Sequence, residues 1–362
     1  MALLTLMIMI LIHEAGHYAV GKLLKFKINE FSIGFGPPIV KINRKNGEKF
    51  SIRCIPLGGF CAFEGEDQDS TVEGSFNSQA PWKRILVLLA GVTCNFLTAI
   101  IIMSILFGSY GYVLPEVTAL NEPVEASTVV NLQEGDIIYE VNGKKVYALA
   151  SFNISSILSK ADKGEVEVTV IRGYKTSKSP SGFVTYSKGH KVKVTTAYDD
   201  FKSVAEDGTE TVYQGLGIMT ASSSYRLGFF PSIGRSFVFF AQLVVFLFQT
   251  IGGLFTGLVS IKGAVGGPIT TIGVISSGIA NGGFRGFMYL LGLMSANLAI
   301  MNVLPLPALD GSRVVFTVIE WIRGKPLNRK VEAIIHTVGL ILLLGLTIVF
   351  DILNLSTIAK LF

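Results

Sequence analysis

Long apolar stretches constrain this chain more than any other feature of its 362 residues. A helix needs about 20 apolar residues to cross the hydrocarbon layer of a bilayer. Four stretches come near or exceed that length, at 1–24, 84–114, 286–309 and 333–355. Only 16% of the residues are charged, whereas soluble domains carry about 25%. The sequence therefore predicts a polytopic α-helical membrane protein with about four transmembrane helices.

A polar segment at 115–222 separates the second and third apolar stretches. Its runs "VEVTVIRG" and "KVKVTTAY" alternate apolar and polar residues as strands do. In "GDIIYEVNGKKV" a strand precedes an Asn142-Gly143 turn, and this spacing resembles a PDZ domain. Another small β-domain with such a turn is the alternative. We expect an N-terminal membrane part at 1–114, a single PDZ-like β-domain at 115–222 and a C-terminal membrane part at 223–362.

A β-hairpin is expected directly after the first apolar stretch. Two strand-like runs within 28–63 flank the turn sequence "NRKNG". Glycine and proline clusters bend the chain on both sides, and the second cluster, "PLGG", contains Gly58 and Gly59. The hairpin can lie in the cytoplasm or dip into the membrane, so we expect a membrane-associated β-hairpin region.

The distribution of charge predicts the orientation. The segment 22–53 carries eight Lys or Arg residues and two Glu residues. The segment 311–331 carries five Lys or Arg residues and one Glu residue. Such segments stay in the cytoplasm. The N-terminus, the PDZ-like domain and the C-terminus are then extracytoplasmic. No basic run interleaved with aromatic residues suggests nucleic-acid binding.

A fifth apolar stretch, at 236–261, is ambiguous. An external PDZ-like domain and a cytoplasmic residue 311 require an odd number of crossings between them, and 286–309 already supplies one. The stretch contains Gln242, Gln249 and the run "TIGGLFTG". We therefore expect an interfacial or re-entrant helix there.

The sequence HEAGH lies inside the first apolar stretch, where polar side chains are costly. It matches HExxH, in which residues i and i+4 share one helical face. His13 and His17 can therefore bind one metal ion, and Glu14 beside them can take a proton from the attacking water. Two buried histidines that simply find polar partners are the alternative.

A catalytic metal site of this kind needs a third protein ligand. The remaining histidines, His190 and His336, have no supporting motif. Asp310 ends the stretch "NVLPLPALD" after two prolines, and on its own it could be an ordinary turn. The first and third apolar stretches both run from outside to inside, however. Asp310 and HEAGH therefore reach a similar depth, and Asp310 is the expected third ligand.

Three asparagines lie in or near these stretches. Asn95 is about eleven residues into the second stretch, near mid-bilayer at about 1.5 Å per residue. Asn297 and Asn302 precede Asp310. Each could hydrogen-bond the substrate or simply join helices.

Several motifs, taken together, resemble the site-2 protease family of intramembrane zinc metalloproteases, in its bacterial RseP/RasP branch with one PDZ domain. In chain order they are HEAGH at 13–17, GFGP at 34–37, PLGG at 56–59, GGPI at 266–269 and the stretch 302–311. The resemblance implies Zn²⁺ bound by His13, His17 and Asp310, with Glu14 as the catalytic base. It also implies that Asn302 positions the substrate and that the hairpin at about 31–63 binds the substrate as an added strand. Val92 departs from the family, whose members often have proline there.

The resemblance further implies regulated intramembrane proteolysis in a bacterial plasma membrane. The expected substrates are single-span membrane proteins such as anti-sigma factors and signal-peptide remnants, and membrane lipid is the other expected partner. The PDZ-like domain would act as a gate above the site. A non-catalytic membrane scaffold that binds peptides through the PDZ-like domain is the alternative function. A metal transporter would need polar residues along several spans, whereas here they cluster at one depth.

Overall fold

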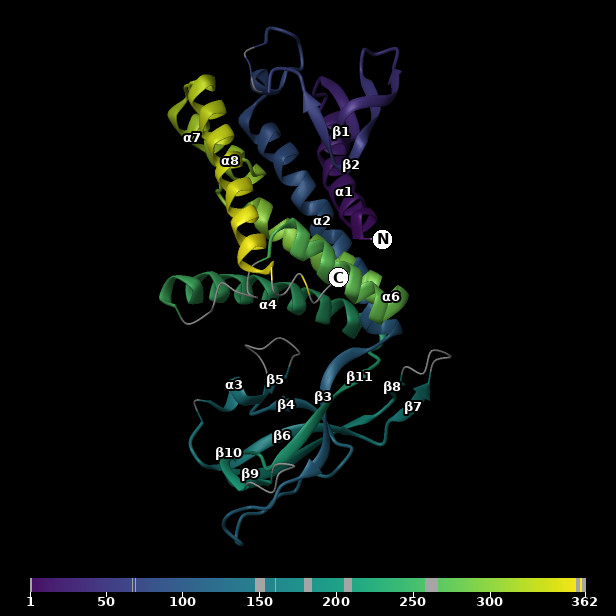
Figure 1. The fold of residues 1–362 in the computed structure, drawn as a ribbon, viewed down its shortest axis with the longest axis vertical. Coiled ribbons are helices and arrows are strands. Elements are labelled where there is room, and N and C mark those ends of the chain that lie inside the picture. Colours follow the sequence, from purple (N-terminus) through teal and green to yellow (C-terminus); the bar gives the residue numbers. More distant parts are fainter. Residues whose placement is uncertain are drawn as a thin grey trace. The chain divides into compact units, whose positions relative to one another are not determined.

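The protein is described by a computed structural model that covers residues 2–66, 68, 70–146, 154–159, 161–178, 184–204, 210–257, 266–355 and 359 (Figure 1). The helices are α1 (Ala2–Leu23), α2 (Pro81–Ser109), α3 (Ile154–Leu158), α4 (Phe229–Thr256), α6 (Pro268–Val303), α7 (Asp310–Arg323) and α8 (Arg329–Leu353), with a short 3₁₀ turn at Phe76–Ser78. The strands are β1 (Ile28–Asn43), β2 (Lys49–Phe63), β3 (Tyr112–Leu120), β4 (Ile137–Val141), β5 (Lys144–Lys145), β6 (Gly164–Arg172), β7 (Lys175–Lys178), β8 (Val184–Ser187), β9 (His190–Val204), β10 (Glu210–Gly215) and β11 (Ile218–Tyr225).

Within the described part of the chain, five helices are long and apolar enough to cross a membrane: α1, α2, α4, α6 and α8. Four of them overlap the stretches predicted to cross, and α4 overlaps the ambiguous one. The interfacial placement of α4 therefore stays a prediction. Along α8 the side chains of Ile341, Leu342 and Ile348 are 60–67% exposed. Such continuous apolar exposure suits a helix surrounded by lipid.

The chain divides into two compact units, Met1–Met103 with Leu243–Phe362, and Ser104–Gln242. The second unit contains a nine-stranded sheet in the order β10-β9-β6-β4-β3-β11-β8-β7, with β5 paired to β4. The predicted Asn142-Gly143 turn joins β4 to β5, and both residues have the positive φ angles that a tight hairpin turn requires. Val141 and Val168 are among the fully buried residues of its core.

Helix α6 is folded back on itself. Gly283 has a φ of 55° and interrupts the helical backbone. A Cβ atom on Gly286 would lie 2.2 Å from the carbonyl oxygen of Gly278, and one on Gly278 would lie 2.6 Å from Leu290. Eight residues of a straight helix span about 12 Å, so the two halves form a tight helical hairpin. Only glycine permits backbones to approach this closely.

The expected span at 286–309 therefore needs correction. Its helix ends at Val303, and Asp310 is the first residue of the separate helix α7. Pro305 and Pro307 explain the break, because proline lacks the amide hydrogen of a helix and restricts the residue before it. Asp310 is thus carried on a loop and a new helix.

Small residues bring α1, α2 and the second half of α6 together. A Cβ atom on Gly16 of α1 would lie 2.5 Å from the carbonyl oxygen of Ala90 in α2. Leu290 packs against Ala2 near the start of α1, and Asn302 lies beside His13 further along it. Helix α1 and the second half of α6 therefore run in the same direction, as the orientation argument predicted.

Strands β1 and β2 form the expected hairpin, but each is bent into two halves (Figure 1). Next to the turn, Asn43 pairs with Lys49. At the other end, Ile33 pairs with both Gly59 and Ile52. The N-terminal half of β1 therefore lies between the two halves of β2, and the segment that contains Gly59 forms an outer edge of the sheet.

A buried ion cluster ties the end of α7 to the starts of α2 and α8. The Glu320 carboxylate lies 2.6 Å from the Arg84 guanidinium and 2.8 Å from that of Arg329. It also accepts a hydrogen bond from the amide of Leu327. Burial alone would raise the pKa of Glu320, but these donors and positive charges outweigh it and hold the pKa below its usual value.

Replacing Glu320 by glutamine should destabilise this end of the membrane unit. The buried Arg84 guanidinium would lose its carboxylate, which costs about 3 kcal/mol, and Arg329 would keep only its pair with Glu332. We expect the thermal unfolding midpoint of the detergent-solubilised protein to fall by about 6 °C or more. The control is Glu167→Gln, because the Glu167–Lys193 pair is largely exposed and should contribute less than about 1 kcal/mol. Equal shifts in the two variants would contradict a stabilising role for the cluster.

Candidate metal centre

The two histidines of HEAGH lie on one face of α1, as their spacing predicted. Their Nε2 atoms are 3.1 Å apart, and both imidazoles are buried. Oδ2 of Asp310 lies 2.9 Å from Nε2 of His13 and 3.4 Å from Nε2 of His17. Side chains nearly 300 positions apart in the sequence therefore meet at one point. Among the described residues, these three form the one group of this kind that could hold a metal ion.

The hydrogen bonds of the imidazoles leave Nε2 available as a ligand. Nδ1 of His17 lies 2.8 Å from the carbonyl oxygen of Val87. Because a carbonyl can only accept, Nδ1 carries the proton and Nε2 keeps its lone pair. Nδ1 of His13 lies 3.4 Å from the Asn95 amide, whose buried Oδ1 has no hydrogen-bond partner among the described residues. A half-turn of this amide would let Oδ1 accept from Nδ1–H of His13 in the same way.

The spacing of the three atoms fits a zinc ion. The two nitrogen atoms and the carboxylate oxygen face one another as acceptors. Such atoms repel one another unless a cation lies among them. Ligands about 2.0–2.1 Å from a tetrahedral zinc ion are separated from each other by about 3.3 Å. The observed separations of 2.9, 3.1 and 3.4 Å surround that value. The donor set, two histidines and one aspartate, is also one that zinc accepts.

Gly91 of α2 keeps this point open. A Cβ atom there would lie 2.4 Å from Nε2 of His17 and 2.8 Å from Cε1 of His13. Any larger residue would occupy the space in front of the imidazole nitrogens. Sequence reasoning missed this role, although the glycine is next to Val92. Helix α2 continues through Val92 without interruption, so the missing proline leaves the site intact.

The loop before Asp310 is held by α8. Ala308 has a φ of 72°, a left-handed conformation that is strained for a residue with a side chain. Its amide donates to Nδ1 of His336 over 3.0 Å. Gly339, one turn later, packs against Pro307 so closely that a Cβ atom would lie 2.1 Å from the proline. His336 is therefore a support for the Asp310 loop, a role that the sequence did not suggest.

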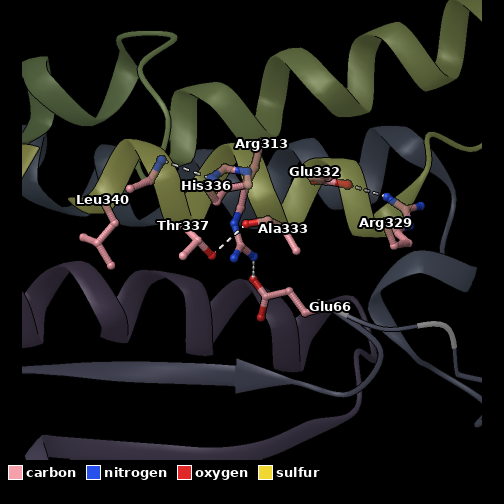
Figure 2. Close-up of a pocket in the computed structure, with 9 residues that line it drawn as sticks. Glu66, Arg313, Arg329, Glu332, Ala333, His336, Thr337 and Leu340 are labelled. Carbon is pink, nitrogen blue, oxygen red and sulfur yellow. Dashed lines mark hydrogen bonds and ion pairs between the residues drawn. The ribbon is translucent and has the colours of Figure 1, made fainter. Parts of the chain in front are cut away.

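A cavity of about 380 Å³ is lined by both partners of this hydrogen bond, Ala308 and His336 (Figure 2). Figure 2 shows His336 and Thr337 along one wall, with Arg313 pointing toward Glu66, with which it forms an ion pair. Glu66 comes from the segment after β2 and Arg313 from α7. The pair therefore joins the β-hairpin region to the helix that begins with Asp310.

Glu14 is oriented by the β-hairpin. Its Oε2 atom accepts a hydrogen bond from the backbone amide of Cys61 over 3.0 Å. The donor lies in the outer half of β2, two residues after Gly59. One carboxylate oxygen is thereby fixed beside the two imidazoles.

The other predicted site residues differ in their proximity to the centre. Nδ2 of Asn302 lies 3.3 Å from Nε2 of His13. Asn297 is half-buried on α6, and among the described residues its side chain makes no hydrogen bond with the three candidate ligands. Gly58 and Gly59 lie on β2 beside α1, and Cβ atoms there would approach the side chains of Ile10 and Leu11 respectively.

A Gly91→Ala substitution should reduce the bound metal. The added methyl group would press against Nε2 of His17, so the stoichiometry should fall well below one ion per chain. Elemental analysis of purified protein measures it. The matched control is Gly345→Ala, because a Cβ atom on this helical glycine meets nothing within 4 Å. A full metal complement in Gly91→Ala protein would show that the space in front of the imidazoles is not the metal position.

Substitutions of His336 should distinguish the effect of its hydrogen bond with Ala308 from the effect of its side-chain volume. In His336→Phe the Ala308 amide loses its acceptor, whereas in His336→Asn the Oδ1 atom stands near the former Nδ1 position. We expect metal to dissociate at least about fivefold faster from the Phe variant, because the cost of an unsatisfied buried amide is about 1–3 kcal/mol. The Asn variant should stay close to the wild type. A chelator-exchange assay measures both rates, and equal loss in both variants would argue against the hydrogen bond as the cause.

Comparisons with known proteins identify the family of this chain. The model of peptidase family M50 matches residues 1–346. A Clostridium perfringens protein whose name describes a zinc metalloprotease is 30% identical over 358 residues, which cover 97% of this chain and 96% of the relative. A Fusobacterium nucleatum protein with such a name is 31% identical over 361 residues, covering 95% and 94% of the two chains. The chain therefore belongs to peptidase family M50, the site-2 protease family, and is a zinc metalloprotease.

Proposed function

We propose that this protein is an intramembrane endopeptidase in which His13, His17 and Asp310 hold the zinc ion. The observation that carries the proposal is the convergence of these three side chains within 3.4 Å of one another. Two of them lie within α1, a helix apolar enough to cross a membrane. Peptide hydrolysis would then take place at the depth of that helix.

Glu14 is proposed as the general base. When bound, zinc supplies the positive charge that polarises the scissile carbonyl and makes water more acidic. Glu14 lies one residue from a ligand, and the Cys61 amide holds one of its oxygens. Its carboxylate can accept a proton from the attacking water and later donate it to the leaving amine. The amide of Asn302, beside His13, can donate a hydrogen bond to the substrate carbonyl oxygen, and Asn95 orients His13 from the other side.

The outer edge of β2 is the proposed place for the substrate backbone. A transmembrane helix satisfies its own amides, so it must unwind before a peptide bond can be reached, and an added strand replaces the lost hydrogen bonds. The segment with Gly58 and Gly59 is such an edge, and two residues later Cys61 contacts Glu14. A strand added there would pass close to the base. Asn297 is retained as a candidate contact further along α6.

The proposed substrates are single-span membrane proteins, such as anti-sigma factors or signal-peptide remnants, in regulated intramembrane proteolysis. The nine-stranded unit is proposed to be a PDZ-like domain of the RseP/RasP type that lies outside the cytoplasm of a bacterium and limits access to the site. The β4–β5 turn and the short helix α3 support this assignment. The scaffold alternative is set aside, because the chain belongs to a family of zinc metalloproteases.

The Glu14→Gln substitution tests the proposed mechanism. Glutamine keeps an oxygen that can accept from Cys61 but cannot take a proton from water. Cleavage of single-span reporter proteins should fall by at least about 100-fold, within the range expected for loss of a general base, while zinc content stays near one ion per chain. Reconstituted protein and product analysis on gels measure cleavage. The control is Glu332→Gln, which changes a carboxylate on α8 that pairs with Arg329. Undiminished cleavage by the Glu14→Gln variant would refute the assigned role.

A further inference from the structure

The sheet-containing unit has a cavity of its own, of about 590 Å³. Part of its wall comes from strands, including Tyr139 of β4, and from Lys188 and Lys191 around the β8–β9 connection. The rest comes from Gly108 near the end of α2 and from residues around the start of α4, namely Arg226, Leu227, Gly228 and Pro231. All of these residues lie within Ser104–Gln242. Neither the fold family nor the protease site accounts for this cavity.

The cavity carries positive charge. Lys188, Lys191 and Arg226 line it with exposed side chains, and none of the described residues that line it is acidic. Nζ of Lys191 lies 3.7 Å from the centre of the Tyr139 ring, and the Arg235 guanidinium lies 4.9 Å from the same ring. Burial would raise the pKa of Tyr139, but Arg235 and Lys191 outweigh it and lower the pKa. The cavity wall is therefore a favourable environment for an anion.

The position of the cavity along the chain places it at a membrane surface. Helix α2 ends at Ser109, next to Gly108, and helix α4 begins at Phe229. Both helices are long and apolar enough to enter a membrane. Phe229 and Phe230 are 74% and 80% exposed. Exposed phenylalanines are typical of the apolar side of a membrane interface, and cations are typical of the level of the lipid head groups.

We propose that this cavity binds the phosphate group of an anionic phospholipid. Lysine and arginine donate charge-assisted hydrogen bonds to phosphate oxygens, and the exposed phenylalanines lie where acyl chains begin. Free phosphate shares the charged chemistry, but it would fill only a small part of the volume and would make no use of Phe229 and Phe230. The bound lipid would link the sheet-containing unit to the bilayer beside the end of α2 and the start of α4.

Native mass spectrometry of the full chain in detergent tests this proposal, with phosphatidylglycerol and phosphatidylcholine as probes. The triple variant Lys188→Ala/Lys191→Ala/Arg226→Ala should bind phosphatidylglycerol at least about tenfold more weakly, because each cation near an anionic surface contributes about fivefold. Phosphatidylcholine binding should not change. The control Lys163→Ala/Lys193→Ala/Lys202→Ala removes the same charge elsewhere on the sheet-containing unit and should bind as the wild type does.

A second variant controls for misfolding caused by substitution at these positions. Lys188→Arg/Lys191→Arg/Arg226→Lys alters the same positions but keeps the charge, and it should retain phosphatidylglycerol binding. Equal binding of the two lipids by the wild type, or undiminished phosphatidylglycerol binding by the alanine triple variant, would overturn the proposal. Saturation of the cavity by inorganic phosphate that phosphatidylglycerol does not displace would overturn the assignment of a lipid as its ligand.

Discussion

The membrane unit depends on one electrostatic constraint: polar groups buried among apolar helices must satisfy one another. Two imidazoles and a carboxylate meet with Nε2 and Oδ2 atoms 2.9–3.4 Å apart. Their outer hydrogen-bonding atoms are directed to Val87 and Asn95, so the inner atoms remain acceptors. A cation among them removes their repulsion. It thereby stabilises the arrangement of the helices that carry the three side chains. The same constraint explains why these polar residues gather at one depth.

Glycine and proline make this convergence sterically possible. Gly16 and Gly91 allow α2 to pass directly over the HEAGH face of α1. Gly283 folds α6 back, and its second half then runs parallel to α1 and delivers Asn302 to His13. Prolines end that helix, so that Asp310 begins a new one. Helix α8 completes the arrangement, because Nδ1 of its His336 accepts a hydrogen bond from the Ala308 amide.

In the proposed function, the β-hairpin links this centre to a peptide substrate. The bends in its two strands turn a simple pair of strands into a small sheet, and the outer edge with Gly58 and Gly59 lies beside α1. The contact between Cys61 and Glu14 joins that edge to the candidate base. Orientation of the base and the proposed alignment of substrate backbone thus depend on the same strand, and Glu66 extends the connection to α7 through Arg313.

Local spacing in the sequence determined much of this protein. Apolar length located the long helices, Asn142-Gly143 located a hairpin turn, and the i, i+4 spacing placed His13 and His17 on one face. Charge asymmetry predicted that the first and third apolar stretches run in the same direction, and the packing of Ala2 and His13 against α6 has that geometry. Other features depended on contacts between distant segments. Three such features are the approach of Gly91 to the imidazoles, the reversal of α6 at Gly283 and the support of Ala308 by His336. None of them produces a periodic pattern in the sequence, because each involves one residue whose partner is far away in the chain. Sequence therefore determined which residues could bind a metal, and tertiary packing decided which of them meet, because only close helix crossings fix distances of about 3 Å between segments nearly 300 residues apart.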